Sequence, residues 1–97
     1  MQQVKLTLNE AGNGRFFIEA SEATLAEMVV AVSDKIITIY HTEVFEKGEG
    51  TGLGKQLLEG VADYAEKNGL NIIPLCSYVL MQFKRNPEKY AGVWSKS

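Results

Sequence analysis

Residues 36–76 predict a strand, a helix and a second strand in close succession, and this order constrains the fold more than any other feature. The run IITIYHTEV at 36–44 is rich in β-branched residues, which suits a central strand. Apolar residues at helical spacing follow over 53–65, and the apolar run LNIIPLC occupies 70–76. A strand, a helix and a strand at this spacing form a right-handed crossover, so we expect the two strands to run parallel.

The chain before this crossover predicts three more strands. Apolar and polar residues alternate over 4–8, as in a strand with one buried face. A turn rich in Asn and Gly follows at 9–14, and further strands are expected at 15–19 and 24–32. Together with the strand at 36–44, these segments predict a four-stranded antiparallel meander.

A short helix is expected after the crossover. The segment SYVLMQFKRN follows the second strand, Ser77 is placed to cap the start of the helix, and Pro87 stands just past its end. The predicted fold class is therefore mixed α and β, with an antiparallel meander, a β-α-β crossover and a short C-terminal helix. Because 45% of the 97 residues are hydrophobic, we expect residues 1–97 to form a single domain around one core.

Charge and cysteine content argue against several classes of protein. A net charge of −2 argues against a nucleic-acid surface, which needs clustered Lys and Arg. No apolar run approaches the roughly 20 residues that cross a bilayer, and the start of the chain lacks the layout of a signal peptide. Cys76 is the single cysteine and there is one histidine, so neither a disulfide nor a zinc site is expected. We therefore expect a cytoplasmic protein, a monomer or weak dimer, that binds no metal, nucleic acid or membrane.

Four alternating glycines lead into the predicted central helix: Gly48, Gly50, Gly52 and Gly54. Glycine lets the backbone approach a ligand closely, and successive amides at a helix start make a partly positive nest for a phosphate group. The P-loop pattern fails, because Glu49 stands at its first glycine and Gln56 at its hydroxyl residue. The dinucleotide fingerprint also fails, because Lys55 stands at its third glycine. A tight turn that simply needs glycine is the alternative explanation.

A third pattern, [QR]-x-x-G-x-[GA], is the diphosphate loop of acyl-CoA-dependent N-acyltransferases, and EGTGLG fits it at both of its small residues. HTEV, EGTGLGKQLL and IIPLCSYV together resemble the small single-domain branch of the GNAT superfamily of N-acetyltransferases, over about residues 4 to 90. Glu49 departs from the usual Gln or Arg, and Asn86 from a histidine that many members have. Both departures bear on the affinity for CoA, although Lys47 and Lys55 are close enough in sequence to offset the charge of Glu49.

The resemblance implies a minimal GNAT fold in which strands 36–44 and 70–76 splay apart and acetyl-CoA lies in the gap. The pantetheine arm would then meet the backbone of Glu43, Val44 and Phe45. The diphosphate would meet the residues at the start of the helix, namely Gly50, Thr51, Gly52, Leu53, Gly54 and Lys55. The implied activity is transfer of an acetyl group from acetyl-CoA to an amine on a protein, a peptide or a small molecule.

His41 and Cys76 are the candidate catalytic residues. Histidine exchanges a proton near neutral pH, and a thiol at a strand-to-helix turn can protonate the leaving sulfur of CoA or accept the acetyl group itself. If the two strands face each other across the cleft, these side chains can approach one another. Glu43 shares the face of His41 and is a competing base, and Tyr78 is a further possible acid. The alternatives are a solvent-facing histidine and a small buried cysteine.

Two other functions stay open. A CoA-binding or sensing module would keep the glycine loop while His41 and Cys76 served only the structure. A plain interaction domain would use the glycines only for the turn and would bind no CoA.

Overall fold

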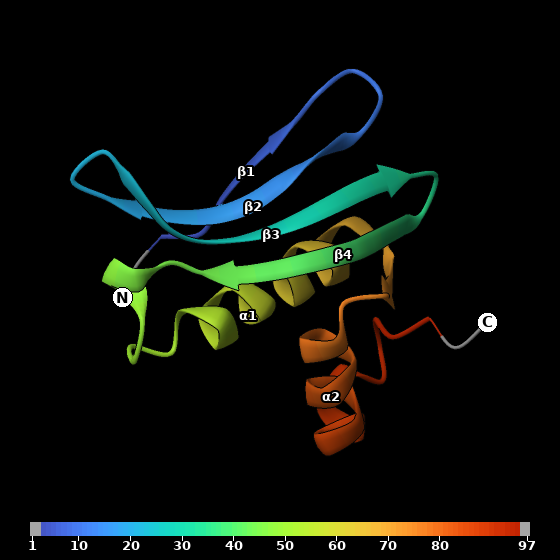
Figure 1. Ribbon diagram of the computed structural model, residues 1–97. Helices are drawn as coiled ribbons and strands as arrows, with labels where there is room; N and C mark the ends of the chain where they lie inside the picture. The colour runs from blue at the N-terminus through green and yellow to red at the C-terminus, as the bar shows by residue number, and fades with distance from the viewer. Residues whose placement is uncertain (1–2, 96–97) are drawn as a thin grey trace.

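The computed structural model describes residues 3–95, which form a five-stranded sheet, one long helix and several shorter ones (Figure 1). In chain order the elements are β1 (Lys5–Leu8), β2 (Asn13–Ala20), β3 (Ala23–Ser33), β4 (Ile36–Val44), the 3-10 helix η1 (Glu46–Gly48), α1 (Leu53–Asn68), β5 (Asn71–Pro74), α2 (Ser77–Arg85) and α3 (Pro87–Tyr90). Within residues 3–95, no helix is long and apolar enough to cross a membrane.

The strands lie in the sheet in the order in which they occur in the chain, β1-β2-β3-β4-β5. The first four pair antiparallel, and β4 and β5 pair parallel with α1 as the connection between them. The predicted meander and crossover are therefore confirmed, and so is the mixed fold class.

The hydrophobic core lies between the sheet and the helices, and α1 and α2 lie on the same side of the sheet (Figure 1). α1 buries the face that its periodicity predicts, and Gly69 ends it in the left-handed conformation. The largest fully buried side chains come from both layers: Ile18, Met28, Val30, Ile37, Ile39, Leu57, Leu58, Val61, Ile72, Val79 and Phe83.

The other side of the sheet, turned away from α1 and α2, is called the open face below. Arg15 on β2 donates a hydrogen bond to Glu27 on β3 at 2.9 Å, and its guanidinium lies 4.1 Å above the ring of Phe17. Val29 is 37% exposed there. This face carries charged and apolar side chains, and no helix of the described part of the chain covers it (Figure 1).

A β-bulge at Tyr40 changes which residues of β4 face the core. Ile39 pairs with Val30, but His41 pairs with Val29, so Tyr40 is the extra residue between two consecutive pairs. A one-residue insertion reverses the alternation of side chains along the rest of the strand.

The partners of the later β4 residues show this reversal. Thr42 pairs with Met28, which is fully buried against the helices, so Thr42 faces the helices. His41 and Glu43 pair with Val29 and Glu27 and so belong to the open face.

β5 is shorter than the predicted strand at 70–76, because it ends at Pro74. The pairing with β4 runs from Ile36 and Asn71 to Ile39 and Pro74, and β4 then continues to Val44 paired with β3. Proline has no N–H to extend a ladder, and the chain turns directly into α2 after it. The cap of α2 is Cys76, not the predicted Ser77, which is the first residue of the helix.

Three elements were not predicted, namely η1, α3 and a parallel bridge beside β5. Ile72 accepts a hydrogen bond from the N–H of Ser95 at 2.9 Å and donates one to Val93 at 2.6 Å. This contact covers the outer edge of β5, the edge that faces away from β4.

Candidate functional site

β4 and β5 part after Ile39 and Pro74, and within residues 3–95 no strand pairs with that edge of β4 over residues 40–44. Phe45 donates its N–H to Leu25 of β3 at 2.8 Å, and in an antiparallel ladder every second residue bonds to the same neighbour. The backbone groups of Glu43 and the N–H of Phe45 therefore point to β3. Those of Thr42 and Val44 point into the gap.

This direction corrects part of the expected pantetheine contact. Glu43 and the N–H of Phe45 are turned to β3, and the carbonyl of Phe45 accepts the N–H of Gly48 at 2.8 Å. Of the three residues named for this contact, Val44 keeps backbone groups turned to the gap. The backbone groups of Thr42 are also turned to the gap, and Thr42 was not among the residues predicted for this contact.

The glycine loop before α1 has the backbone conformation that glycine permits. Gly50 and Gly52 have φ angles of 79° and 74°, and a Cβ at either position would meet no atom within 4 Å. Gly52 is the N-cap of α1, so the amides of the first helical turn have no acceptor within the helix. The hydroxyl of Thr51 donates a hydrogen bond to the carbonyl of Gly48 at 2.6 Å and closes the loop.

A cleft of about 450 Å³ joins the free edge of β4 to the glycine loop and to the start of α1. Its lining residues come from four segments of the chain: Thr42, Val44, Gly48, Glu49, Gly50, Gly52, Leu53, Gly54, Lys55 and Tyr78. Among the predicted cofactor-binding residues, Glu43, Phe45 and Thr51 do not line it. Glu49 and Lys55, which carry opposite charges, both line the cleft.

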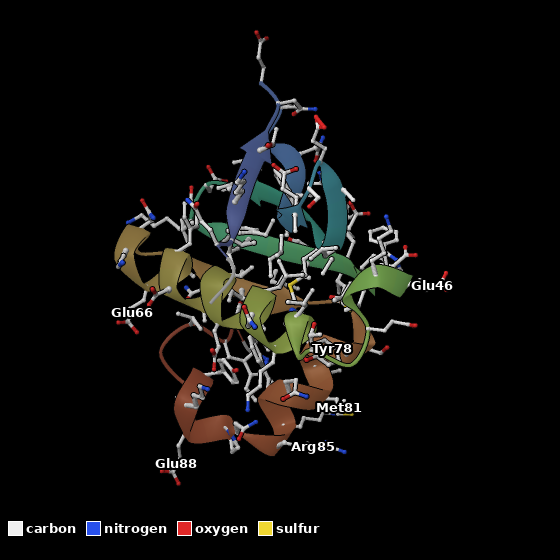
Figure 2. The ribbon with its side chains drawn as sticks, turned by 90° about the vertical axis from the view of Figure 1, so that its left-hand side faces the viewer. Glu46, Glu66, Tyr78, Met81, Arg85 and Glu88 are labelled. Atoms are coloured by element: carbon white, nitrogen blue, oxygen red, sulfur yellow. The ribbon has the colours of Figure 1, made fainter. Side chains whose placement is uncertain are left out.

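Tyr78 forms the α2 side of the cleft. A Cβ at Gly54 would lie 3.2 Å from the hydroxyl oxygen of Tyr78, so the ring packs directly on the first turn of α1, as Figure 2 shows. Burial first, and then the proximity of Tyr90 and Cys76, raise the pKa of Tyr78 above 10.0. Tyr78 therefore stays protonated near neutral pH and offers an O–H donor at the cleft.

Cys76 lies next to the cleft at the junction of β5 and α2. Its side chain is only 8% exposed, and its Sγ lies 3.2 Å from the hydroxyl oxygen of Thr42. The residue that meets Cys76 from β4 is therefore Thr42.

His41 lies on the open face, where its Nε2 is 3.5 Å from Oε1 of Glu43. The two side chains are 60% and 49% exposed. The expectation that His41 and Cys76 approach one another is wrong, because the bulge at Tyr40 turns His41 away from the helices.

Two comparisons with known proteins bear on this arrangement. The family model described as GCN5-related N-acetyl-transferase matches residues 15–93. Among solved structures, the chain is similar to the NMR solution structure of a protein from Staphylococcus aureus that is described as a candidate GCN5-like N-acetyltransferase. The two chains are 30% identical, the match covers 98% of this chain and 91% of the other, and the TM-score is 0.69.

Proposed function

Because the chain belongs to the GCN5-related N-acetyltransferase family, we propose that it binds acetyl-CoA in the cleft and transfers the acetyl group to an amine. One observation carries this proposal. The cleft joins a strand edge with free backbone groups to a helix start with free amides, and these two features suit the two halves of the CoA molecule.

The loop offers space and backbone N–H donors for a diphosphate. The open space beside Gly50 and Gly52 admits phosphate oxygens, and the first amides of α1 supply N–H donors at the positive end of the helix dipole. Lys55 adds a positive charge, and Glu49 opposes it. Thr42 and Val44 would hold the pantetheine arm through their backbone groups, as a strand holds its neighbour.

Acetyl-CoA supplies an activated thioester, and the chain must supply proton transfers. Thr42 and Tyr78, which each carry a hydroxyl, line the cleft, and the thiol of Cys76 lies 3.2 Å from the hydroxyl of Thr42. We propose that one of these three side chains donates the proton that the leaving CoA sulfur needs. His41, with Glu43 beside it, would accept the proton of an amine that arrives over the open face of β4.

The first experiment is isothermal titration of the protein with CoA and with acetyl-CoA. Gly52→Asp fills the open space at the loop with a carboxylate, so we expect the affinity to fall at least tenfold, about 1.4 kcal/mol. Gly69→Asp is the matched control, because Gly69 also has a left-handed φ with nothing within 4 Å but lies at the far end of α1. Equal loss of affinity in both variants would point to the stability of the fold and not to the loop.

The second part of the experiment measures turnover. Acetyl-CoA is mixed with amines of different kinds, such as a lysine-containing peptide and a polyamine, and the release of free CoA thiol is followed. Binding of CoA without release on any amine would support a binding or sensing module. Absence of binding to the wild-type protein at millimolar ligand would contradict the proposal.

A further inference from the structure

We propose that the hydroxyl of Thr42 relays a proton from the thiol of Cys76 to the cleft, an inference that rests on the proposed function. Thr42 Oγ1 lies 3.2 Å from Cys76 Sγ, and either atom can donate the hydrogen bond. Thr42 lines the cleft and Cys76 does not. One hydroxyl thus stands between a buried thiol and the space assigned to the thioester.

The backbone holds Cys76 at this position. Its N–H donates to the carbonyl of Ile39 at 3.0 Å, and its own carbonyl accepts the N–H of Leu80 at 3.0 Å. The first bond spans the point where β4 and β5 part, and the second begins α2. These two bonds fix the backbone of Cys76, and its side chain is 8% exposed, so the shortest route from the thiol to the cleft runs through its hydrogen-bonded neighbour Thr42.

The bulge at Tyr40 is what brings Thr42 to this place. Without it, the alternation that sends Ile37 and Ile39 toward the helices would also send His41 there and leave Thr42 on the open face. Because of the inserted residue, the hydroxyl of Thr42 lies beside Cys76 in place of the imidazole of His41. A hydroxyl can accept a hydrogen bond from a thiol and donate one to a thiolate, so it can serve both protonation states.

The proposed step balances in atoms and charge. The amine nitrogen bonds to the acetyl carbon, and the bond from that carbon to the CoA sulfur breaks with its electron pair on sulfur. The CoA sulfur takes the proton of the Thr42 hydroxyl while the Thr42 oxygen takes the proton of the Cys76 thiol. The proton lost by the amine passes to His41 and then to solvent, one proton returns from the cleft through the Thr42 hydroxyl to the Cys76 thiolate, and the products are an amide and CoA thiol.

Tyr78 is the rival donor, because it also lines the cleft and carries a hydroxyl. Donation through Thr42 and donation by Tyr78 predict different kinetic effects of substitutions at Thr42 and Cys76. A relay through Thr42 makes Thr42 and Cys76 a unit, so removing either should cost as much as removing both. If Tyr78 protonates CoA directly, substitutions at Thr42 and Cys76 have small and independent effects.

The test measures kcat and KM for acetyl-CoA in Thr42→Val, Thr42→Ser, Cys76→Ala and the double variant Thr42→Val/Cys76→Ala. We expect kcat to fall about 100-fold in Thr42→Val, the size of a general-acid contribution, with little change in KM. Thr42→Ser keeps the hydroxyl and should stay within about threefold of the wild type, since it preserves the donor and acceptor of the relay. The double variant should match the worse single variant. Thr38→Val is the matched control, because Thr38 pairs with Ala31 on the open face of the same strand, and it should keep wild-type kcat.

Each outcome decides the proposal. Wild-type kcat in Thr42→Val, or additive losses in the double variant, would overturn the relay while the proposed function stands. An acetyl group found on Cys76 by intact mass would also overturn it, because the thiol would then reach the thioester itself. If the wild-type protein binds acetyl-CoA but transfers nothing, or does not bind it, the proposed transfer fails and the relay fails with it.

Discussion

At the residue scale, the alternating glycines of the loop meet three different geometric needs. A Cβ at Gly48 would lie 2.8 Å from the carbonyl oxygen of Leu25 in β3, so close packing requires glycine there. The two middle glycines have left-handed φ angles and open space beside them. A Cβ at Gly54 would lie 3.2 Å from the hydroxyl of Tyr78. A substitution at Gly48 should therefore disturb the packing against β3. A substitution at either middle glycine should strain the backbone, and one at Gly54 should displace the Tyr78 ring.

Glu49 is expected to weaken the binding of CoA, because this acidic residue lines the same cleft as the glycines of the loop. Glu49→Gln removes one negative charge at nearly constant volume. For a charge at the surface the gain is about 1 kcal/mol or less, so we expect CoA to bind up to about fivefold more tightly. Titration calorimetry at low and high salt measures this, and the gain should shrink at high salt.

Glu46→Gln is the control for this prediction. Glu46 lies in η1, does not line the cleft and points away from the molecule in Figure 2. An equal gain in this variant would show that net charge, and not the position of Glu49, sets the affinity.

At the scale of the elements, the strands and helices follow from periodicity, but the direction of the side chains on β4 does not. Uniform alternation along this strand places His41 with Ile39 on the core side and therefore near Cys76. The bulge at Tyr40 shifts the alternation by one residue, and Thr42 takes that position instead. A bulge depends on how two strands pair, which the pattern of one strand cannot reveal. The glycine loop was found because its signal is local: Gly residues directly before a helix.

The turn between β2 and β3 stores backbone strain that substitution can relieve. Ser21 and Glu22 have φ angles of 50° and 66°, a conformation that hairpin turns usually assign to Asn-Gly. We expect Ser21→Asn/Glu22→Gly to raise the free energy of unfolding by about 1 kcal/mol, because a left-handed non-glycine residue costs about that much. Urea denaturation measures the change. Glu22→Ala serves as the control, since it removes the charge but keeps the Cβ, and a similar gain there would assign the effect to charge.

At the scale of the whole molecule, two tyrosines tie the C-terminal helices to the rest of the core. Tyr90 stacks on Phe83 of α2 with ring centroids 4.6 Å apart, and Tyr78 packs on the first turn of α1. Burial is the main cause that raises the pKa of both tyrosines above 10.0. The overall architecture could be predicted from the sequence, whereas these contacts could not, because α3 was not predicted and its tyrosine had no assigned neighbour.

The raised pKa values of Tyr78 and Tyr90 predict that the free energy of unfolding falls at alkaline pH. Above pH 10.0 the unfolded chain releases these tyrosine protons before the folded chain does, so their contribution to stability is full below that pH and falls as the pH rises through the folded values. Urea denaturation between about pH 8 and about pH 11 should show a shallower decline in Tyr78→Phe and in Tyr90→Phe than in the wild type. Tyr40→Phe is the control, because Tyr40 is 52% exposed. An equal decline in all variants would contradict the prediction.

The pairing of β4 with β5 also bears on how the chain folds. The first four strands form from hairpins between neighbours, whereas β5 returns to β4 only after residues 45–70 have closed a loop around the helix. Closing a loop of this length costs conformational entropy, so the β4–β5 pairing is expected to form late in folding and to separate early in unfolding. A ligand in the cleft would contact residues on both sides of this pairing. By binding only the paired form, it would slow the separation of β5 and the C-terminal helices from β4.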